Sequence, residues 1–128
     1  MGALDKIMSP LLERPIISYS LQAFNDSPQV TSIVLVMSQQ KVDVGRRLVA
    51  ENGWNKVSDV CAGGERRQDS VRLGLERTKD AEWVIVHDGA RPCVDAGLIV
   101  RGLAEARETG AAAAAVPVTD TVKSAGTD

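Results

Sequence analysis

Polar side chains suited to nucleotide chemistry gather in two short segments of this 128-residue chain. Residues 63–70 have the sequence Gly-Gly-Glu-Arg-Arg-Gln-Asp-Ser, and residues 87–92 have the sequence His-Asp-Gly-Ala-Arg-Pro. Each segment follows a short apolar run that is typical of a strand and leads into a pattern typical of a helix. If the two strands are parallel, both segments lie at the carboxyl edge of one sheet, where open α/β folds bind nucleotides.

Asp88 is the strongest single candidate for chemistry. A carboxylate at the end of a buried strand could hold a hard cation beside a polyphosphate, because Mg²⁺ prefers carboxylate, phosphate and water oxygens. Asp88 could equally cap a helix or turn. Arg91 offers a planar fork that suits a phosphate, or a surface ion pair. His87, the only histidine, is expected to be packed or hydrogen-bonded rather than a catalytic base.

The glycine pair of the first segment could bring the backbone close to a flat ligand. Gly63 and Gly64 carry no side chain, so neighbouring N–H groups could contact the polar edge of such a ligand. Glu65 and Ser70 add an acceptor and a hydroxyl, which suit the edge of a pyrimidine. Taken alone, however, the two glycines are better explained as a plain turn.

Three further residues have weaker claims. Lys6 lies in a polar lead-in and could offer a positive charge to phosphates, although a lysine near a terminus is usually only solvated. Thr121 and Lys123 follow the last apolar run and repeat the placement of a polar group after a strand. No nucleophile with a paired base is visible, so covalent catalysis has no support.

The elements that must position these residues alternate along the chain. Helices are expected from Pro15 to residue 24, over residues 42–51, over residues 71–75 with Asp69 or Ser70 as the cap, and from Asp95 to about residue 109. Strands are expected over residues 32–37, 57–61, 83–86 and 111–118. This alternation predicts one α/β domain over residues 1–128, with a parallel sheet.

Composition excludes several classes of protein. The chain has 15 basic and 17 acidic residues and a net charge of -2, which does not support non-specific binding to nucleic acid. No apolar run approaches the ~20 residues that span a bilayer, so no membrane partner is expected. The two cysteines lack metal-ligand spacing, and the default expectation is a reduced, cytoplasmic setting.

Together the motifs resemble the 2-C-methyl-D-erythritol 4-phosphate cytidylyltransferase family of the non-mevalonate isoprenoid pathway. The resemblance rests on residues 63–71, 74–75, 86–92 and 117–123, in that order and at compatible spacing, and on the opening residues 1–6 and 12–15. It implies a Rossmann-like, three-layer nucleotidyltransferase fold with a mainly parallel sheet. It also implies truncation at both ends, with the first strand and the C-terminal part missing.

The resemblance further implies roles for individual residues. Lys6 and Asp88 would be catalytic, with Lys6 on the triphosphate and Asp88 on the ribose and Mg²⁺. The residues that bind CTP would be Lys6, Gly64, Glu65, Ser70, Asp88 and Gly89, with Gly64, Glu65 and Ser70 on the cytosine. Arg91 and Thr121 would contact the phosphate of the sugar alcohol from across a homodimer interface.

The implied reaction is attack of a substrate phosphate oxygen on the α-phosphorus of CTP, with pyrophosphate leaving. Such transfers depend on positioning and charge stabilisation. Loss of the central first strand would leave two inner strands without a partner between them, so this chain alone is expected to be marginally stable and poorly active. The alternatives are a ribitol 5-phosphate cytidylyltransferase, a nucleotide-sugar glycosyltransferase and a non-catalytic flavodoxin-like binding module.

Overall fold

The computed structural model describes residues 6–78 and 80–123. The first five residues of the expected opening motif, and residues 124–128, lie outside this part. The main elements are α1 (Ile16–Asp26), β3 (Ile33–Met37), α2 (Val42–Asn52), β4 (Val57–Ala62), α3 (Arg67–Leu75) and α4 (Ala96–Thr109). The short elements are η1 (Lys6–Met8), β1 (Pro10–Leu11), β2 (Arg14–Pro15) and η2 (Gln39–Lys41).

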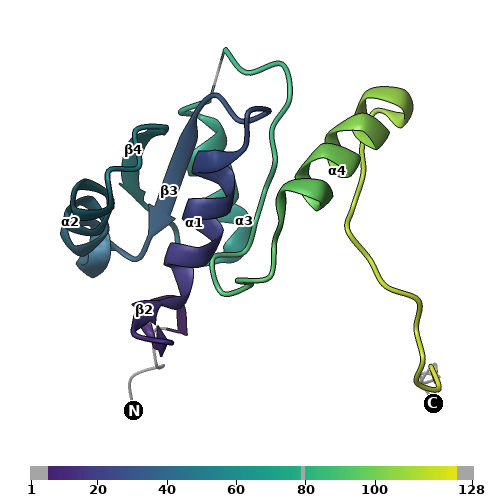
Figure 1. Cartoon of the computed structure of the whole chain (residues 1–128), viewed down its shortest axis with the longest axis horizontal. Coiled ribbons are helices and arrows are strands. Elements are labelled where there is room, and N and C mark those ends of the chain that lie inside the picture. Colours follow the sequence, from purple (N-terminus) through teal and green to yellow (C-terminus); the bar gives the residue numbers. More distant parts are fainter. Residues whose placement is uncertain (1–5, 79, 124–128) are drawn as a thin grey trace.

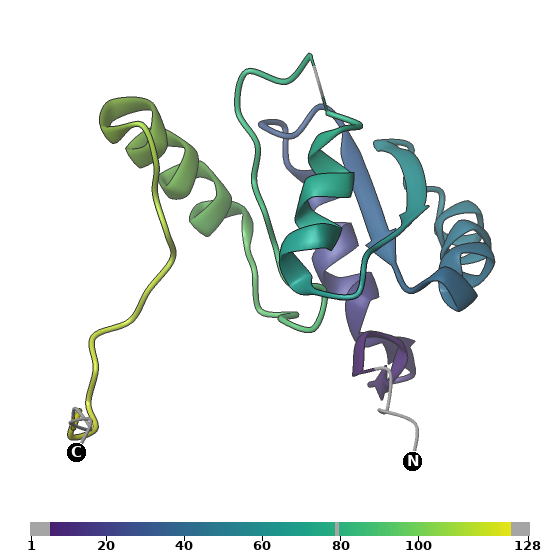
Figure 2. The ribbon, with the colours of Figure 1, turned by 180° about the vertical axis from the view of Figure 1, so that it is seen from behind.

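The centre of the fold is a parallel pair of strands, β3 and β4, joined through α2 (Figure 1). The register runs from Ile33 beside Val57 to Met37 beside Ala62. Helices α1 and α2 cover one face of this pair, and α3 covers the other (Figure 2). The predicted α/β class and its three layers are therefore confirmed.

Two buried clusters hold these layers together. The larger lies between the pair of strands and helices α1 and α2, and its buried members are Ile17, Leu21, Leu35, Met37, Val42, Trp54 and Val60. The smaller joins α1 to α4 through Phe24, Ile99 and Leu103. Helix α1 contributes to both clusters because its apolar residues recur every three or four positions. The same helix therefore ties α4 to the sheet.

The helix boundaries follow the capping signals of the sequence. Helix α2 ends at Gly53, whose φ of 64° is the left-handed conformation that glycine adopts at low cost. Helix α4 begins where the Asp95 carboxylate accepts a hydrogen bond of 2.7 Å from the Leu98 N–H. It ends at Gly110, with φ of 88°. These predicted boundaries are confirmed.

The predicted start of α3 is wrong by a few residues. The helix begins at Arg67, and Arg66 is its cap. Asp69 takes part from inside the first turn, where its carboxylate accepts a hydrogen bond of 3.3 Å from the Arg66 backbone N–H. The acid lies at the third helical position and completes the cap formed by Arg66, so the helix begins before Asp69 and not after it.

The strands expected over residues 83–86 and 111–118 are absent from the described part of the chain. Residues 83–86 run in the same direction as β3 but form no ladder (Figure 1). The side chains of Val84, Ile85 and Val86 are 44%, 41% and 50% exposed. Residues 111–118 extend away from the other elements in both opposite views (Figures 1 and 2). A strand needs a neighbouring strand that satisfies its backbone groups, and no described strand pairs with either run.

No helix in the described ranges is both long enough and apolar enough to cross a membrane.

The turn between β1 and β2 holds two side-chain-bearing residues in the left-handed region. Leu12 has φ of 46° and Glu13 has φ of 70°. Residues other than glycine and asparagine adopt this conformation at a cost of about 1–2 kcal/mol each. The turn therefore carries local strain directly before α1.

Replacing Glu13 with glycine should relieve half of this strain. We expect the Glu13→Gly variant to raise the free energy of unfolding by about 1 kcal/mol, as measured by urea denaturation. Glu13→Ala is the matched control, because alanine removes the same carboxylate but keeps the cost of positive φ. Equal stability of the two variants would contradict strain at this turn.

Candidate functional site

The glycine pair directly after β4 packs tightly on the first turn of α3. The Gly63 N–H donates a hydrogen bond of 2.7 Å to the Met37 carbonyl and so continues the ladder beyond the strand. A Cβ on Gly63 would lie 2.4 Å from the Ser70 Oγ, and a Cβ on Gly64 would lie 2.4 Å from the Asp69 Cβ. At Gly64 the Asp69 Cβ, which is attached to the helix backbone, occupies the space that a side chain would need, and at Gly63 a side chain would displace the Ser70 hydroxyl.

Ser70 holds this loop together from within. Its Oγ accepts a hydrogen bond of 3.2 Å from the Gly64 N–H. Glu65 is exposed, and none of the hydrogen bonds or ion pairs of the described residues involves it. The predicted residues Gly64, Glu65 and Ser70 are thus neighbours in one exposed loop, with Ser70 fixing the backbone that presents Glu65.

The second predicted segment forms a turn that is anchored on α1. The Arg91 N–H donates to the Asp88 carbonyl at 3.0 Å, which closes the turn over Gly89. The Ser20 hydroxyl of α1 donates to the Arg91 carbonyl at 3.1 Å. A Cβ on Gly89 would lie 3.1 Å from the Ile17 Cδ1, so the turn approaches α1 closely where it has no side chain.

His87 is a packing residue, as expected. Its ring meets the Phe24 ring of α1 edge to face, with 5.1 Å between the centroids. Burial lowers the pKa of His87 below its ordinary value of 6.5; the neighbouring Asp88 carboxylate opposes that shift, and Arg91 adds to it. The imidazole is therefore neutral at physiological pH and anchors the turn.

The two segments meet through Asp88. Arg67, at the start of α3, donates hydrogen bonds to the Asp88 Oδ1 from Nε at 3.0 Å and from Nη2 at 2.7 Å. The Arg91 Nε lies 3.2 Å from the Asp88 Oδ2. Hydrogen bonding to Arg67 is the largest cause of the lowered pKa of Asp88, with the charges of Arg67 and Arg91 adding to it. Asp88 is therefore ionised at neutral pH and joins the two predicted segments.

Lys6 lies next to a residue, Ile7, that contacts the 88–91 turn. It lies exposed in η1. The adjacent Ile7 has its Cγ2 3.4 Å from where a Cβ on Gly89 would lie. Lys6 therefore belongs to a segment that borders the 88–91 turn, although none of the hydrogen bonds and ion pairs of the described part involves its ammonium group.

Thr121 is the predicted site residue that the structure does not bring to the others. It lies in the extended, exposed segment after α4, which both views place apart from α3 and the 88–91 turn (Figures 1 and 2). Residues 119–123 do not converge with the other two segments in the described arrangement. Convergence required residues 111–118 to form a strand within the sheet, and they have no strand partner there.

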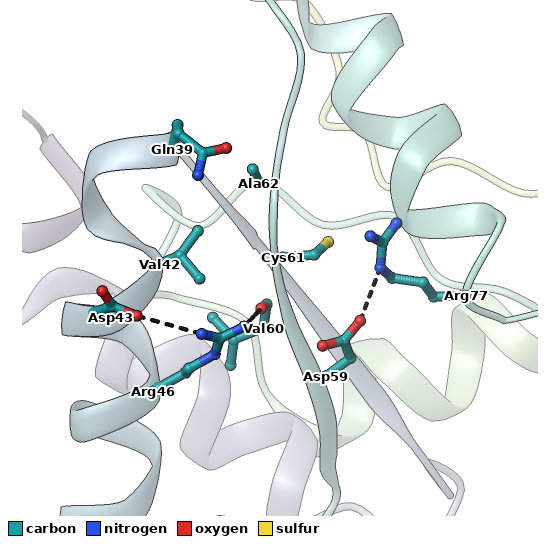
Figure 3. Close-up of a pocket in the computed structure, with 9 residues that line it drawn as sticks. All are labelled: Gln39, Val42, Asp43, Arg46, Asp59, Val60, Cys61, Ala62 and Arg77. Carbon is teal, nitrogen blue, oxygen red and sulfur yellow. Dashed lines mark hydrogen bonds and ion pairs between the residues drawn. The ribbon is translucent and has the colours of Figure 1, made fainter.

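The cavity shown in Figure 3 has a different lining, although one of its residues, Ala62, directly precedes the glycine pair. It measures about 280 Å³, lies along the outer edge of β4 and contains none of the predicted site residues. Its arginines are already paired: Arg46 lies 3.3 Å from Asp43, and Arg77 lies 2.8 Å from Asp59. Its charges are internally balanced, so we place the chemistry at Asp88.

The donor set around Asp88 fits a cation that arrives with a polyphosphate. No cluster of three or more His, Cys, Asp or Glu side chains occurs within residues 6–78 and 80–123. A single carboxylate, completed by phosphate and water oxygens, is a donor set that Mg²⁺ commonly takes at nucleotide sites. Asp88 is therefore the described side chain that could hold such a cation, together with phosphate and water oxygens.

Sequence reasoning missed Arg67 as a site residue. It lies within the motif that carries the resemblance, but nothing in its spacing shows that it meets an aspartate 21 positions later. The available signal was its place directly after a glycine loop, at the start of a helix. Cations are disfavoured near a helix N-terminus, so an arginine there calls for a nearby carboxylate.

Fold and site together define a class of protein. A parallel α/β core flanked by helices, with a glycine loop after one strand and an acidic turn after the next apolar run, is a Rossmann-like nucleotidyltransferase arrangement. Residues 2–128 match the family described as "IspD: 2-C-methyl-D-erythritol 4-phosphate cytidylyltransferase". The chain belongs to this family.

Curated relatives carry the same name. The chain is 45% identical over 123 residues to the 2-C-methyl-D-erythritol 4-phosphate cytidylyltransferase of Dehalococcoides mccartyi strain 195, covering 96% of this chain and 54% of that protein. It is 44% identical over 122 residues to that of Shouchella clausii, covering 95% and 53%. It is 35% identical over 120 residues to that of Clostridium tetani, covering 94% and 49%. The chain thus spans about half the length of these relatives, and the matches do not favour the alternative classes.

Substitution of the second glycine should destabilise the loop. In Gly64→Ala the new Cβ would collide with the Asp69 Cβ, which is attached directly to the α3 backbone and cannot rotate away. We expect the free energy of unfolding to fall by about 1–3 kcal/mol, measured by urea denaturation. Gly102→Ala is the control, since a Cβ there meets no atom within 4 Å. That variant should gain about 0.5–1 kcal/mol from helix propensity. A loss of stability in both, or in neither, would argue against tight loop packing.

His87 should make the stability of the fold depend on pH. Its folded pKa lies below the unfolded value of 6.5, so the folded state binds fewer protons and its stability falls as pH drops through 6.5. Asp69 and Asp88 have pKa values lowered from 3.8, so their contribution is lost only in stronger acid. Urea denaturation should show a lower free energy of unfolding at about pH 5.5 than at about pH 7.5 in the unmodified chain, and no such difference in His87→Phe. An equal difference in the variant would show that His87 is not the cause of the pH dependence.

Proposed function

We propose that this chain forms the CTP-contacting part of an enzyme that transfers a cytidylyl group from CTP to 2-C-methyl-D-erythritol 4-phosphate. The observation that carries the proposal is the bridge from Arg67 to Asp88, with distances of 3.0 Å and 2.7 Å. It places the glycine loop and the acidic turn at one end of the fold. The names of the relatives supply the identity of the two substrates.

In this proposal the glycine loop binds the cytosine of CTP. Backbone groups around Gly64 and the carboxylate of Glu65 face the cytosine, and Ser70 fixes the loop through its hydrogen bond with the Gly64 N–H. Asp88 contacts the ribose and the cation. Gly89 has no side chain and so lets the nucleotide approach the turn closely. Lys6 contacts the triphosphate.

The reaction needs no protein nucleophile. A phosphate oxygen of the acceptor attacks the α-phosphorus of CTP, and the bond from that phosphorus to the oxygen it shares with the β-phosphorus breaks as pyrophosphate leaves. A bound Mg²⁺ would neutralise charge on the phosphates. The work of this chain is to hold the nucleotide in line and to present Lys6 and Arg91 to its negative charge.

We also propose that the whole protein is a cytoplasmic homodimer in which Arg91 and Thr121 reach the acceptor phosphate across the interface. Exposed apolar side chains support an interface, since Val116, Val118 and Val122 are 85%, 71% and 79% exposed. Both cysteines are free thiols, in keeping with a reducing compartment. Because Thr121 lies apart from Arg91 here, turnover by this chain alone is expected to be slow.

Nucleotide binding by the purified chain tests the proposal. Titration with CTP and Mg²⁺, followed by amide chemical shifts, should perturb residues 63–70 and 87–91, with weaker effects from ATP. Asp88→Asn should weaken CTP binding by about tenfold or more, because charged hydrogen bonds are worth about 1.5–3 kcal/mol.

Asp59→Asn provides the matched control. Asp59 is also paired with an arginine, and its side chain is 42% exposed against 37% for Asp88, but it lies at the cavity of Figure 3. This variant should bind CTP as tightly as the unmodified chain. Absence of CTP binding, or equal loss in the two variants, would contradict the proposed function.

A further inference from the structure

We propose that Arg67 is a positioning residue, which orients the Asp88 carboxylate so that only its Oδ2 atom keeps an acceptor position free for the nucleotide and its cation. The inference rests on the proposed function. It gives a role to an arginine that neither the resemblance nor the spacing of the motifs singled out.

The first support is the geometry of the bridge. Both Nε and Nη2 of Arg67 donate to the same oxygen, Oδ1, at 3.0 Å and 2.7 Å. A carboxylate oxygen has two lone pairs, so Oδ1 is saturated. The Oδ2 atom has one cationic contact, the Arg91 Nε at 3.2 Å. One acceptor position on Oδ2 therefore stays free among the contacts of the described residues.

The second support is the placement of Arg67 in its helix. It is the first residue of α3, where the peptide dipoles disfavour a cation. The helix start is held by the Arg66 and Asp69 cap and by the Gly64 and Ser70 hydrogen bond, so the base of the Arg67 side chain is fixed. Residues that are unfavourable for the local helix geometry are expected mainly at functional sites, and an arginine at a rigid helix N-terminus is such a residue.

The third support is that the bridge joins two separately anchored elements. Arg67 comes from α3, on one face of the sheet, whereas Asp88 belongs to the turn held by Ser20 and Ile17 of α1 on the other face. Without the bridge, Arg91, three residues away in the same turn, would be the one ion-pair partner of the Asp88 side chain among the described residues. Arg67 is therefore the contact that fixes Asp88 relative to the glycine loop.

The test compares Arg67→Ala and Arg67→Lys with Arg72→Ala. Arg72 lies on the same helix, its side chain is 67% exposed like that of Arg67, and it pairs with Glu76 at 3.0 Å. Each alanine variant thus removes one equally exposed, ion-paired guanidinium. Thermal melting verifies that every variant is folded. If Arg67→Ala does not fold, Arg67→Lys is compared with the unmodified chain in its place.

The first measurement needs no ligand. Backbone ¹⁵N relaxation should show lower order parameters for residues 88–91 in Arg67→Ala than in the unmodified chain or in Arg72→Ala. Lysine restores the charge but not the two parallel donors, so Arg67→Lys should lie in between. Unchanged order parameters in Arg67→Ala would overturn the positioning role, whatever the chain does with CTP.

The second measurement is a double-mutant cycle on the dissociation constant of CTP with Mg²⁺. Arg67→Ala should weaken binding about five- to tenfold in the unmodified chain and by less than about twofold in the Asp88→Asn background, since coupled residues are not additive. Equal losses in both backgrounds would mean that Arg67 contacts the nucleotide directly, which overturns the inference. If the unmodified chain binds no CTP while the order parameters still respond, the proposed function fails and the positioning of Asp88 stands.

Discussion

The arrangement of the site depends on one helix that packs in two directions. Helix α1 buries Ile17 and Leu21 against the parallel strands, and it presents Ser20 and Phe24 to the turn that carries Asp88. The turn has no ladder to hold it, because the run before it is not paired with any described strand. Its position relative to the sheet is therefore set by side-chain packing, by the hydroxyl hydrogen bond from Ser20 and by the hydrogen bonds from Arg67 to Asp88. Any change that moves α1 moves Asp88 as well.

Electrostatics then gives this turn its chemical character. Two guanidinium groups, of Arg67 and Arg91, face the single carboxylate of Asp88, so the cluster keeps an excess positive charge. These groups are well exposed to solvent, and ion pairs of that kind add little to the stability of a fold. Their value lies in orientation, since they fix the carboxylate and leave cationic surface for an anionic ligand. A polyphosphate chelating a cation is a ligand of matching chemistry.

The glycine loop shows a second way to fix a site without burying it. Gly63 and Gly64 lie so close to the first turn of α3 that a side chain on either would collide with Ser70 or Asp69. Loop and helix therefore form one rigid unit, although most of the loop is exposed. Backbone N–H groups in such a unit can contact a base with little loss of conformational entropy. The family to which the chain belongs is named for transfer of a cytidylyl group, and a rigid loop beside an ionised acid suits that chemistry.

The sequence by itself determined the helices, the first two strands and the two segments that carry the site. Capping is local: Asp95 and Gly110 bound α4 through contacts within four residues, so a short stretch of sequence suffices to predict them. The apolar run of β3 was also informative, since a strand covered on both faces is expected to be continuously apolar. The places of Asp88, Arg91, Gly64 and Ser70 after apolar runs were enough to predict them as residues of the candidate site.

Only the tertiary structure decided which of these segments meet. Residues 83–86 and 111–118 have strand-like sequences, yet a strand forms only beside a partner, and partnership is not a property of the run itself. Thr121 was therefore misplaced, and Arg67 was missed, because its meeting with Asp88 depends on how α1, the sheet and α3 stack. Local preferences act over a few residues and leave their signature in the sequence, whereas contacts between distant segments arise from packing that no single segment encodes.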